Sequence, residues 1–196
     1  MKRRLITLVL TGIILTGCAQ NAESDIKNHT DSIASVETDS EEIAETEQEP
    51  YIVTFEGRTL EGEEFSSECF GESKLTMINV WATYCSPCLN EMPDLGEIAS
   101  AYDKSEFQIL GIVSDVMENG EDSQLEYAKE LVTETKADYP HLVLNESLYT
   151  NLVGGIDSVP TTFFVNQEGE MLGYMVGAQS KDAWEELISE LLADLP

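Results

Sequence analysis

One stretch decides the fold, and it reads Trp81-Ala82-Thr83-Tyr84-Cys85-Ser86-Pro87-Cys88-Leu89-Asn90-Glu91-Met92-Pro93. The apolar run 75–80 before it predicts a buried strand, and residues 86–102 predict a helix. Two cysteines at a strand-to-helix junction indicate redox chemistry, because a helix N-terminus offers unpaired N–H groups and a partial positive charge. This field favours the thiolate of Cys85, which we predict to be the attacking sulfur. Cys88 is expected one turn further in, where it closes the disulfide onto Cys85.

A C-x-x-C pair is also half of a zinc site, so the other possible ligands matter. Zinc needs two more ligands at suitable spacing. The remaining cysteines and histidines are isolated from one another: Cys18, His29, Cys69 and His141. Because none has a partner, we predict a redox pair with no metal and no cofactor.

Two motifs together resemble a known family. The stretch 81–93 is similar to the active site of membrane-anchored thioredoxin-like proteins of the TlpA/ResA type, and the run 158–165, Ser-Val-Pro-Thr-Thr-Phe-Phe-Val, resembles their second hallmark. The resemblance covers about residue 50 to the C-terminus. It implies thiol–disulfide oxidoreductase activity and an α/β thioredoxin fold with an N-terminal β-hairpin and an internal helix-strand insertion.

The resemblance also suggests roles for residues around the pair. It places an acidic residue at Glu91, where a carboxylate could raise a cysteine pKa or accept its proton; the alternative is a solvated helix glutamate. It implies a cis bond between Val159 and Pro160, in a loop whose Val159 backbone pairs with an extended substrate. The alternative is a structural proline at the start of a strand. Asn79 stands where cytosolic thioredoxins carry a buried aspartate, so it cannot act as a base.

Three further side chains each have two interpretations. Trp81 and Tyr84 form either an apolar, substrate-contacting rim around Cys85 or part of the core. Cys69 is either a third redox cysteine or a buried, inert thiol. His141 has no evident partner and is interpreted as structural.

The N-terminal 49 residues predict export and attachment to a membrane. Residues 1–17 combine a basic start with a short apolar run, as in a signal peptide. Leu15-Thr16-Gly17-Cys18 resembles a bacterial lipobox, with Cys18 as the lipidated residue; the alternatives are an ordinary signal peptide or an uncleaved anchor. Residues 18–49 are acidic and lack aromatic residues, so we predict a disordered tether with at most a short helix at 33–44. The predicted location is extracytoplasmic, on the bacterial cell membrane.

The net charge excludes some partners. The chain has 10 basic and 38 acidic residues, a formal charge of −28. Such a chain repels nucleic acid and anionic lipid. A monomer is the default expectation.

The folded domain is predicted to span residues 50–196. Strands are expected at 51–55 and 58–65 as a hairpin, and then at 75–82, 107–113, 142–144, 161–165 and 171–176. Helices are expected at 86–102, 122–135, 147–153 and 181–195, with Ser180 as the N-cap of the last. The insertion is placed at 118–145.

The leading hypothesis is a protein-disulfide reductase for exported proteins. The resemblance implies electrons from a membrane thiol transporter of the CcdA/DsbD type. The alternatives are a disulfide-forming oxidase of the same fold and a lipid-anchored copper-binding module. A peroxiredoxin-like peroxidase needs P-x-x-x-T-x-x-C, and no proline stands four residues before Thr83.

Overall fold

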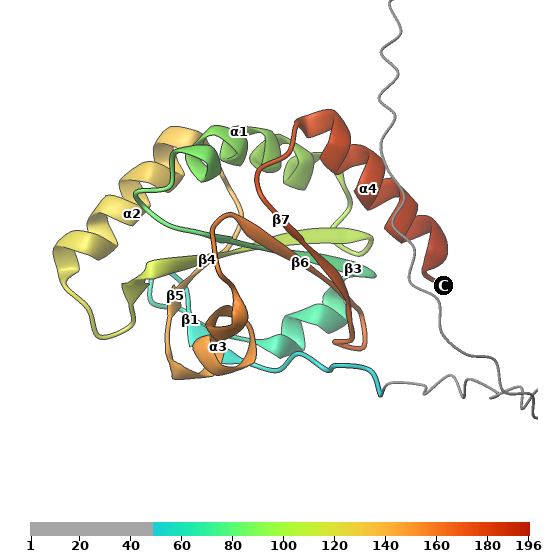
Figure 1. The fold of residues 1–196 in the computed structure, drawn as a ribbon, viewed down its shortest axis with the longest axis horizontal. Helices are drawn as coiled ribbons and strands as arrows, with labels where there is room; N and C mark the ends of the chain where they lie inside the picture. Colours follow the sequence, from blue (N-terminus) through green and yellow to red (C-terminus); the bar gives the residue numbers. More distant parts are fainter. Residues whose placement is uncertain (1–48) are drawn as a thin grey trace, which may run out of the picture. The chain divides into compact units, whose positions relative to one another are not determined.

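The strand that leads to the cysteine pair is the centre of a five-stranded sheet. The structure is a computed structural model, and it describes residues 49–196. The strand order is β5-β4-β3-β6-β7, in which β3, β4 and β5 are parallel, and β6 and β7 are antiparallel to their neighbours. Every residue of β3 is buried, as expected for a strand covered on both faces. Thioredoxin-like topology follows, with mixed α/β layers (Figure 1).

The elements within residues 49–196 follow one another in a single chain order. They are β1 (Glu56–Arg58), β2 (Glu64–Ser66), the 3₁₀ helix η1 (Ser67–Glu72), β3 (Leu75–Trp81), α1 (Ser86–Ala101), β4 (Phe107–Met117), α2 (Asp122–Thr135), β5 (His141–Leu144), α3 (Glu146–Asn151), η2 (Val153–Gly155), β6 (Thr161–Asn166), β7 (Met171–Val176) and α4 (Lys181–Asp194).

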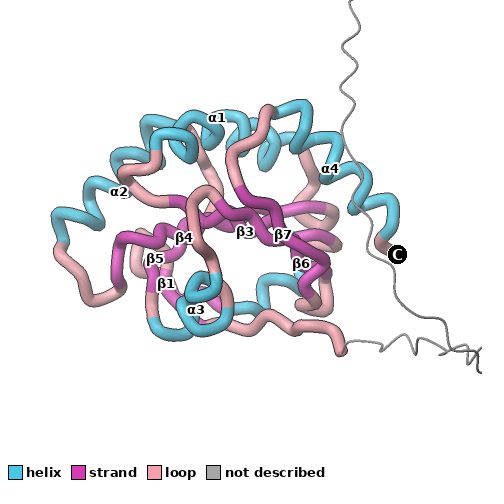
Figure 2. Tube along the Cα trace, in the orientation of Figure 1, coloured by secondary structure: helices cyan, strands magenta, loops and turns pink. Residues whose placement is uncertain are grey.

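Helices cover the two faces of the sheet unequally. Helices α1, α2 and α4 lie along one face, while α3, η1 and the β1–β2 hairpin lie on the other (Figures 1 and 2). On the first face Leu95 and Ile98 of α1 pack with Trp184 and Ile188 of α4 in one buried cluster. Long helices with a full apolar stripe close this face, whereas the six residues of α3 leave part of the other face open.

The N-terminal hairpin is present but displaced from its predicted position. The predicted strand 51–55 forms no regular strand, and the hairpin joins Glu56–Arg58 to Glu64–Ser66. Between the two strands Gly62 has a φ of +86°, a conformation that glycine adopts readily in a turn. Gly57, which follows Glu56 as a turn-like pair in the sequence, lies within β1 instead, where a Cβ would meet Leu148 of α3 at 3.4 Å, an ordinary van der Waals distance.

The other predicted elements are confirmed to within a few residues. Helix α2 and strand β7 have the predicted bounds, and Ser180 caps α4 by accepting a hydrogen bond from the Ala183 N–H. The insertion holds α2 and β5 as expected. The predicted signal peptide, Cys18 and nearly all of the predicted tether lie outside the described residues. No helix within residues 49–196 is long and apolar enough to cross a membrane.

Candidate active site

Cys85 and Cys88 form a disulfide at the first turn of α1. The two sulfurs are 2.01 Å apart, and the two Cα atoms are 5.3 Å apart. Cys85 is the N-cap residue of α1, and its Sγ accepts a hydrogen bond from the Cys88 N–H at 3.2 Å. Cys85 is 6 % exposed and Cys88 is fully buried. The N–H group and the helix N-terminus lie where the predicted Cys85 thiolate needs them, and the thiolate itself stays a prediction.

The loop between β3 and α1 is held by a residue that the sequence analysis missed. The carboxylate of Asp115 accepts hydrogen bonds from the Thr83 N–H, at 3.0 and 3.2 Å, and from the Thr83 hydroxyl. Asp115 lies in β4 beyond Val113, the residue paired with Trp81 at the end of β3. An acidic residue following a buried run is a signal that could have found it, because parallel strands end at the same edge. Asp115 therefore fixes the turn that presents Cys85.

Trp81 and Tyr84 occupy different environments. Tyr84 is 76 % exposed, so it is available for a rim around the pair. Trp81 is fully buried, and its Nε1–H donates to Nδ1 of His141 at 3.1 Å. The interpretation of Trp81 as an exposed rim residue is therefore corrected, and its alternative, a core residue, holds.

His141 has the partners that the sequence did not reveal. Because Nδ1 accepts from Trp81, the ring proton lies on Nε2, which donates to the Ala137 carbonyl oxygen at 3.0 Å. Burial lowers the pKa of His141 to about 4, although the bond to Ala137 acts in the opposite direction. His141 is thus a neutral structural residue with both ring nitrogens engaged.

The loop before β6 lies against the cysteine pair. The peptide bond between Val159 and Pro160 is cis. The half-buried Val159 packs against the buried cluster that contains Cys85 and Cys88. The Thr161 hydroxyl donates to the Ser158 carbonyl oxygen at 2.8 Å and so closes the loop. The structure brings this predicted loop and the disulfide together; the pairing of Val159 with a substrate stays a prediction.

Glu91 is buried beneath the pair and is not solvated. Its side chain is 3 % exposed. One carboxylate oxygen accepts from Asn79 Nδ2 at 3.2 Å, and the other accepts from the Gln179 N–H at 3.1 Å and from Trp184 Nε1 at 3.4 Å. Burial raises the pKa of the Glu91 carboxyl, although these three donors act in the opposite direction. The alternative of a solvated helix glutamate is wrong.

A pattern in the sequence could have predicted this burial. Cys88, Glu91, Met92 and Leu95 follow i, i+3, i+4, i+7 spacing and share the buried face of α1. A carboxylate on the apolar face needs buried donors. These come from Asn79 in β3 and from two residues at the C-terminal end of the chain, which sequence spacing does not connect to it.

Asn79 forms the floor of the same polar network. It is fully buried, and its Nδ2 donates to Thr162 Oγ1 at 3.1 Å as well as to Glu91. Its Oδ1 and the Tyr139 hydroxyl are the buried side-chain polar atoms without a partner among residues 49–196. Burial raises the pKa of Tyr139, and the Glu91 carboxylate acts in the same direction. Asn79 donates both bonds from its amide nitrogen, while its Oδ1 accepts none among residues 49–196.

Cys69 cannot reach the pair. It lies in η1 before β3, and its carbonyl oxygen accepts from Gln108 Nε2 at 2.9 Å near the start of β3 and β4. The seven residues of β3 separate this end from the pair by about 20 Å. Cys69 is buried, and burial raises the pKa of its thiol to about 12. The alternative of a third redox cysteine is wrong, and the inert-thiol alternative holds.

No three His, Cys, Asp or Glu side chains within residues 49–196 lie together in a way that could hold a metal ion. The site therefore offers two sulfurs that can exchange disulfides, one buried carboxyl group that can hold a proton near them, and a loop beside them.

Comparison with known proteins agrees with this geometry. The model of the AhpC/TSA family matches residues 51–172. The chain is 28% identical to the sporulation thiol-disulfide oxidoreductase A of Bacillus subtilis strain 168 over 147 residues, which is 73% of this chain and 85% of that protein. It is 23% identical to the thiol-disulfide oxidoreductase ResA of Bacillus thuringiensis subsp. konkukian over 142 residues, which is 72% of this chain and 74% of that protein.

A solved structure also matches. An exposed lipoprotein thioredoxin from Streptococcus pneumoniae strain TIGR4 is 27% identical, with a TM-score of 0.58, over 70% of this chain and 98% of the other. Since the matched family model spans well over half of the 196 residues, the chain belongs to the AhpC/TSA family, as a ResA-like thiol–disulfide oxidoreductase with the thioredoxin fold.

Proposed function

We propose that the protein reduces disulfide bonds of exported proteins on the outer side of the cytoplasmic membrane. The observation that carries this proposal is the asymmetry of the pair. Cys85, at the N-terminus of α1, keeps 6 % of its surface exposed, while Cys88 is fully buried behind it. A partner disulfide can meet only Cys85, so attack and resolution are assigned to different sulfurs.

The reaction balances over two exchange steps. The Cys85 thiolate attacks one sulfur of the substrate disulfide; that S–S bond breaks, a mixed disulfide forms, and the leaving sulfur takes up a proton. The Cys88 thiol then loses its proton and attacks Cys85 Sγ, which frees the second substrate thiolate, and this too is protonated. The substrate gains two electrons and two protons, and the chain ends with the Cys85–Cys88 disulfide seen in the structure.

Glu91 is proposed to hold the proton that Cys88 must lose. It follows Cys88 by three residues on the same face of α1, and its carboxyl group is desolvated. A Glu91→Gln variant keeps the size of the side chain and removes the titrating group. We expect slower release of the substrate thiol and a changed pH profile of exchange between pH 5 and 9. An unchanged profile would assign Glu91 a structural role only.

Export and lipidation complete the proposal. Its support is the signal-like segment 1–17, the lipobox ending at Cys18, and the relation to an exposed lipoprotein thioredoxin. Electrons are proposed to come from a membrane thiol transporter of the CcdA/DsbD type, as the ResA resemblance implies. Mass spectrometry of the membrane-bound chain should find a diacylglycerol on an N-terminal Cys18, and a Cys18→Ala variant should lose it.

The reduction potential of the pair tests the direction of electron flow. The chain is equilibrated in thiol buffers of known potential and trapped by alkylation. A value near or below about −250 mV fits a reductase, since thioredoxin lies at about −270 mV. A value near about −120 mV would mean a disulfide-forming oxidase. If no disulfide forms, the copper-binding alternative gains weight and a metal titration follows, although His141 has both ring nitrogens engaged.

A further inference from the structure

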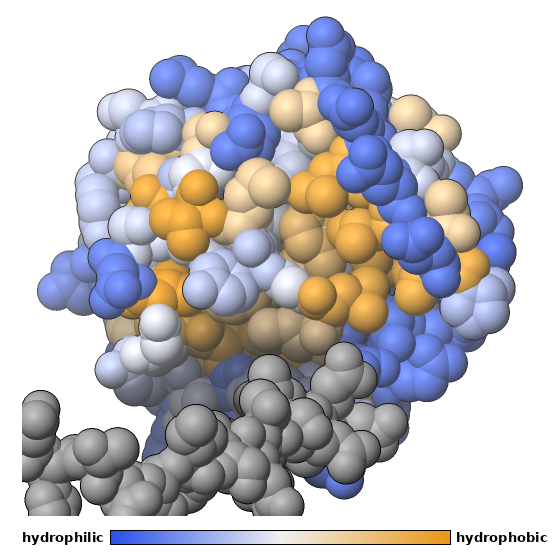
Figure 3. Space-filling model, turned by 45° about the vertical axis from the view of Figure 1, so that its right-hand side comes forward, coloured by the Kyte–Doolittle hydropathy of each residue, from blue (hydrophilic) through white to orange (hydrophobic). Residues whose placement is uncertain are grey.

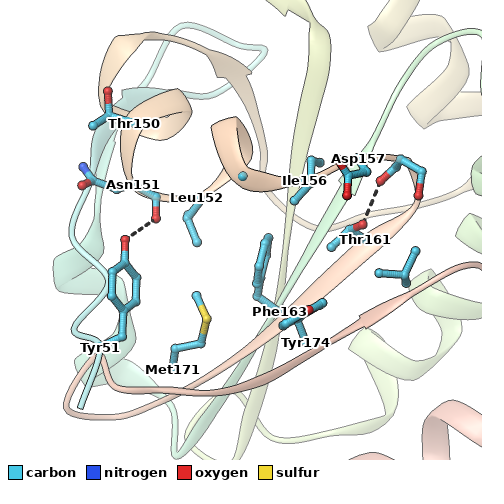
Figure 4. A pocket seen from close by; sticks show the side chains of 13 residues that line it. Tyr51, Thr150, Asn151, Leu152, Ile156, Asp157, Thr161, Phe163, Met171 and Tyr174 are labelled. Atoms are coloured by element: carbon cyan, nitrogen blue, oxygen red, sulfur yellow. Dashed lines mark hydrogen bonds between the residues drawn. The ribbon is translucent and has the colours of Figure 1, made fainter. Parts of the chain in front are cut away.

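An apolar groove of about 490 Å³ opens on the face of the sheet that carries α3. Its floor is made by Phe163 of β6 with Met171 and Tyr174 of β7, and its opposite wall includes Leu152 and Ile156 from the segment after α3 (Figure 4). The rings of Phe163 and Tyr174 pack at 6.1 Å between centroids. Such a groove is suited to a bulky apolar side chain.

The groove exists because this face of the sheet is only partly covered. Helix α3 ends at Asn151, after six residues. Beyond it, Tyr174 and Val176 of β7 line the groove and are 66 % and 55 % exposed. The space-filling view shows apolar surface gathered in the middle of the molecule, with hydrophilic surface around it (Figure 3). Exposed apolar residues grouped along one strand mark a binding surface more often than residues scattered singly.

The groove is continuous with the redox site through Val159. This side chain packs against the cluster that contains both cysteines and also against the cluster that contains Leu152 and Phe163. Ser158 and Thr161, on either side of Val159 and Pro160, both line the groove. Thr161 lies at its near end and Tyr51 at its far end (Figure 4). A polypeptide bound at Val159 can therefore continue into the groove. An extended chain advances about 3.3 Å per residue, so two to five residues span about 7–17 Å.

The charge of the domain determines which residues are favoured on either side of the bound apolar side chain. Residues 49–196 contain 29 acidic and 6 basic side chains, a net charge of −23. Five of the six basic residues already form ion pairs: Arg58, Lys74, Lys104, Lys129 and Lys181. Asp157, at the end of the groove beside the loop, is exposed and pairs with no basic residue of the described chain. Lysine or arginine next to the bound side chain is therefore favoured.

We propose that this groove recognises the substrate polypeptide, by binding a bulky apolar side chain flanked by lysine or arginine and located within about five residues of the disulfide that is reduced. This inference rests on the proposed function, for which it specifies the class of substrate. The groove contacts the substrate away from the reacting sulfurs, so it governs the encounter with a polypeptide and not the exchange of a small disulfide.

The test compares peptides that differ only in these features. Each peptide has one central cysteine joined by a disulfide to glutathione. In the first peptide, phenylalanine stands two and four residues from the cysteine on both sides, and each phenylalanine has a neighbouring lysine. The second peptide has alanine in place of phenylalanine. The third has glutamate in place of lysine. The reduced chain from residue 18 onward, with Cys18→Ser, converts each into one peptide thiol and one glutathione thiol, and it becomes oxidised at Cys85 and Cys88. Stopped-flow measurement gives the second-order rate constant.

Two variants and one control accompany the wild type. Tyr174→Ser removes an exposed wall of the groove, and Asp157→Asn removes its charge. Tyr127→Ser is the matched control, because Tyr127 is also a half-exposed tyrosine, but it belongs to α2 and does not line the groove. Thermal unfolding of all four chains checks that they are folded.

The proposal predicts three results. The wild type reduces the phenylalanine-lysine peptide about tenfold faster than the alanine peptide, a typical effect of burying an apolar group, and about two- to fivefold faster than the glutamate peptide, a typical effect of pairing an exposed charge. Tyr174→Ser abolishes the preference for phenylalanine, Asp157→Asn weakens the preference for lysine, and Tyr127→Ser changes neither. All four chains exchange with glutathione disulfide at the same rate.

Other outcomes overturn the inference. Equal rates for the three peptides, with normal exchange of glutathione disulfide, would refute the groove and leave the proposed function intact; no exchange with glutathione disulfide would refute the proposed function itself. Light scattering could show that the wild type is a dimer and that Tyr174→Ser is a monomer. If the peptide rates of the two were then equal, the groove would be assigned to a second copy of the chain. Ile33 and Val36 are apolar residues of the predicted tether. If Ile33→Ser or Val36→Ser speeds the reduction of the phenylalanine-lysine peptide, the groove would be assigned to the chain's own N-terminal segment.

Discussion

At the residue scale, Glu91 sets the chemistry around the pair. A carboxyl group with three hydrogen-bond donors is stable when ionised, but its burial disfavours the charge. The three donors come from parts of the chain far apart in the sequence: Asn79 from within β3, Gln179 from the segment between β7 and α4, and Trp184 from α4. The acidic residue could be identified from the motif, but its burial depends on these tertiary contacts.

Glu91 gives stability a defined dependence on pH. Its folded-state pKa is raised, so the folded chain binds a proton more readily than the unfolded chain. Its contribution is therefore fully present at low pH and is lost as pH rises through the raised pKa. The Glu91→Gln variant should accordingly lose less stability relative to wild type at pH 8 than at pH 5. Urea unfolding at both values measures this, and a larger loss at pH 8 would contradict it.

Trp81 supports the site from the core. A Trp81→Phe change keeps a ring but leaves Nδ1 of the buried His141 without its donor. We expect a loss of about 1–3 kcal/mol in the free energy of unfolding. The rate of exchange with glutathione disulfide should stay within about twofold, given the buried position. Tyr84→Phe, at an exposed tyrosine, is the control and should change stability by less than about 0.5 kcal/mol.

At the element scale, α1 is positioned by one close approach. Gly96 faces the turn after α2, and a Cβ at this position would collide with the Lys136 carbonyl oxygen. Lys136 itself ends α2 in a left-handed conformation, with a φ of 54°. The helix that carries the pair therefore lies directly against backbone. A glycine inside a predicted helix often indicates close contact with another segment, but the sequence alone does not identify that segment.

Substitution of Gly96 tests this packing. Gly96→Ala should destabilise the fold by about 1–3 kcal/mol, since the backbone of the α2 turn must shift, and this outweighs the helix preference of alanine. Gly173→Ala in β7 is the matched control, because a Cβ there meets no atom within 4 Å. Chemical unfolding of both variants gives the comparison. Equal stability of the two variants would mean that α1 does not depend on the close approach.

Most elements could be predicted because their periodicity is local. Strand β3 is a continuous apolar run, and α2 and α4 have apolar residues at helical spacing. The N-terminal hairpin was misplaced for a physical reason. Gly57 pairs with Phe65 inside the hairpin, whereas a glycine at such a place in the sequence usually indicates a turn. Asp115 was missed in the same way, since its partner Thr83 lies 32 residues away.

At the scale of the whole molecule, the surface is dominated by acidic residues. The domain of residues 49–196 carries a net charge of −23, and most of its basic residues are already paired. Such a surface repels itself and disfavours the compact state at neutral pH. The acidic surface could be predicted from the composition alone. The groove could not, because it depends on the shortness of α3.

Screening should therefore stabilise the fold. Raising sodium chloride from about 0.02 to 0.5 M shortens the Debye length to within a few ångströms. We expect a gain on the order of 1 kcal/mol, which corresponds to about 2–4 °C in Tm for a chain of this size. Differential scanning calorimetry at pH 7 measures the shift. A fall in Tm with salt would show that the ion pairs outweigh the repulsion.

The central claim is that Cys85 attacks and Cys88 resolves. The most direct measurement is the reaction of a Cys88→Ser variant with glutathione disulfide, followed by mass spectrometry of its proteolytic fragments. Without a resolving sulfur the exchange should stop after the first step, and we predict one glutathionyl group on Cys85 and none on the buried Cys69. Failure of Cys85 to form the adduct, or an adduct at Cys69 in its place, would contradict the account.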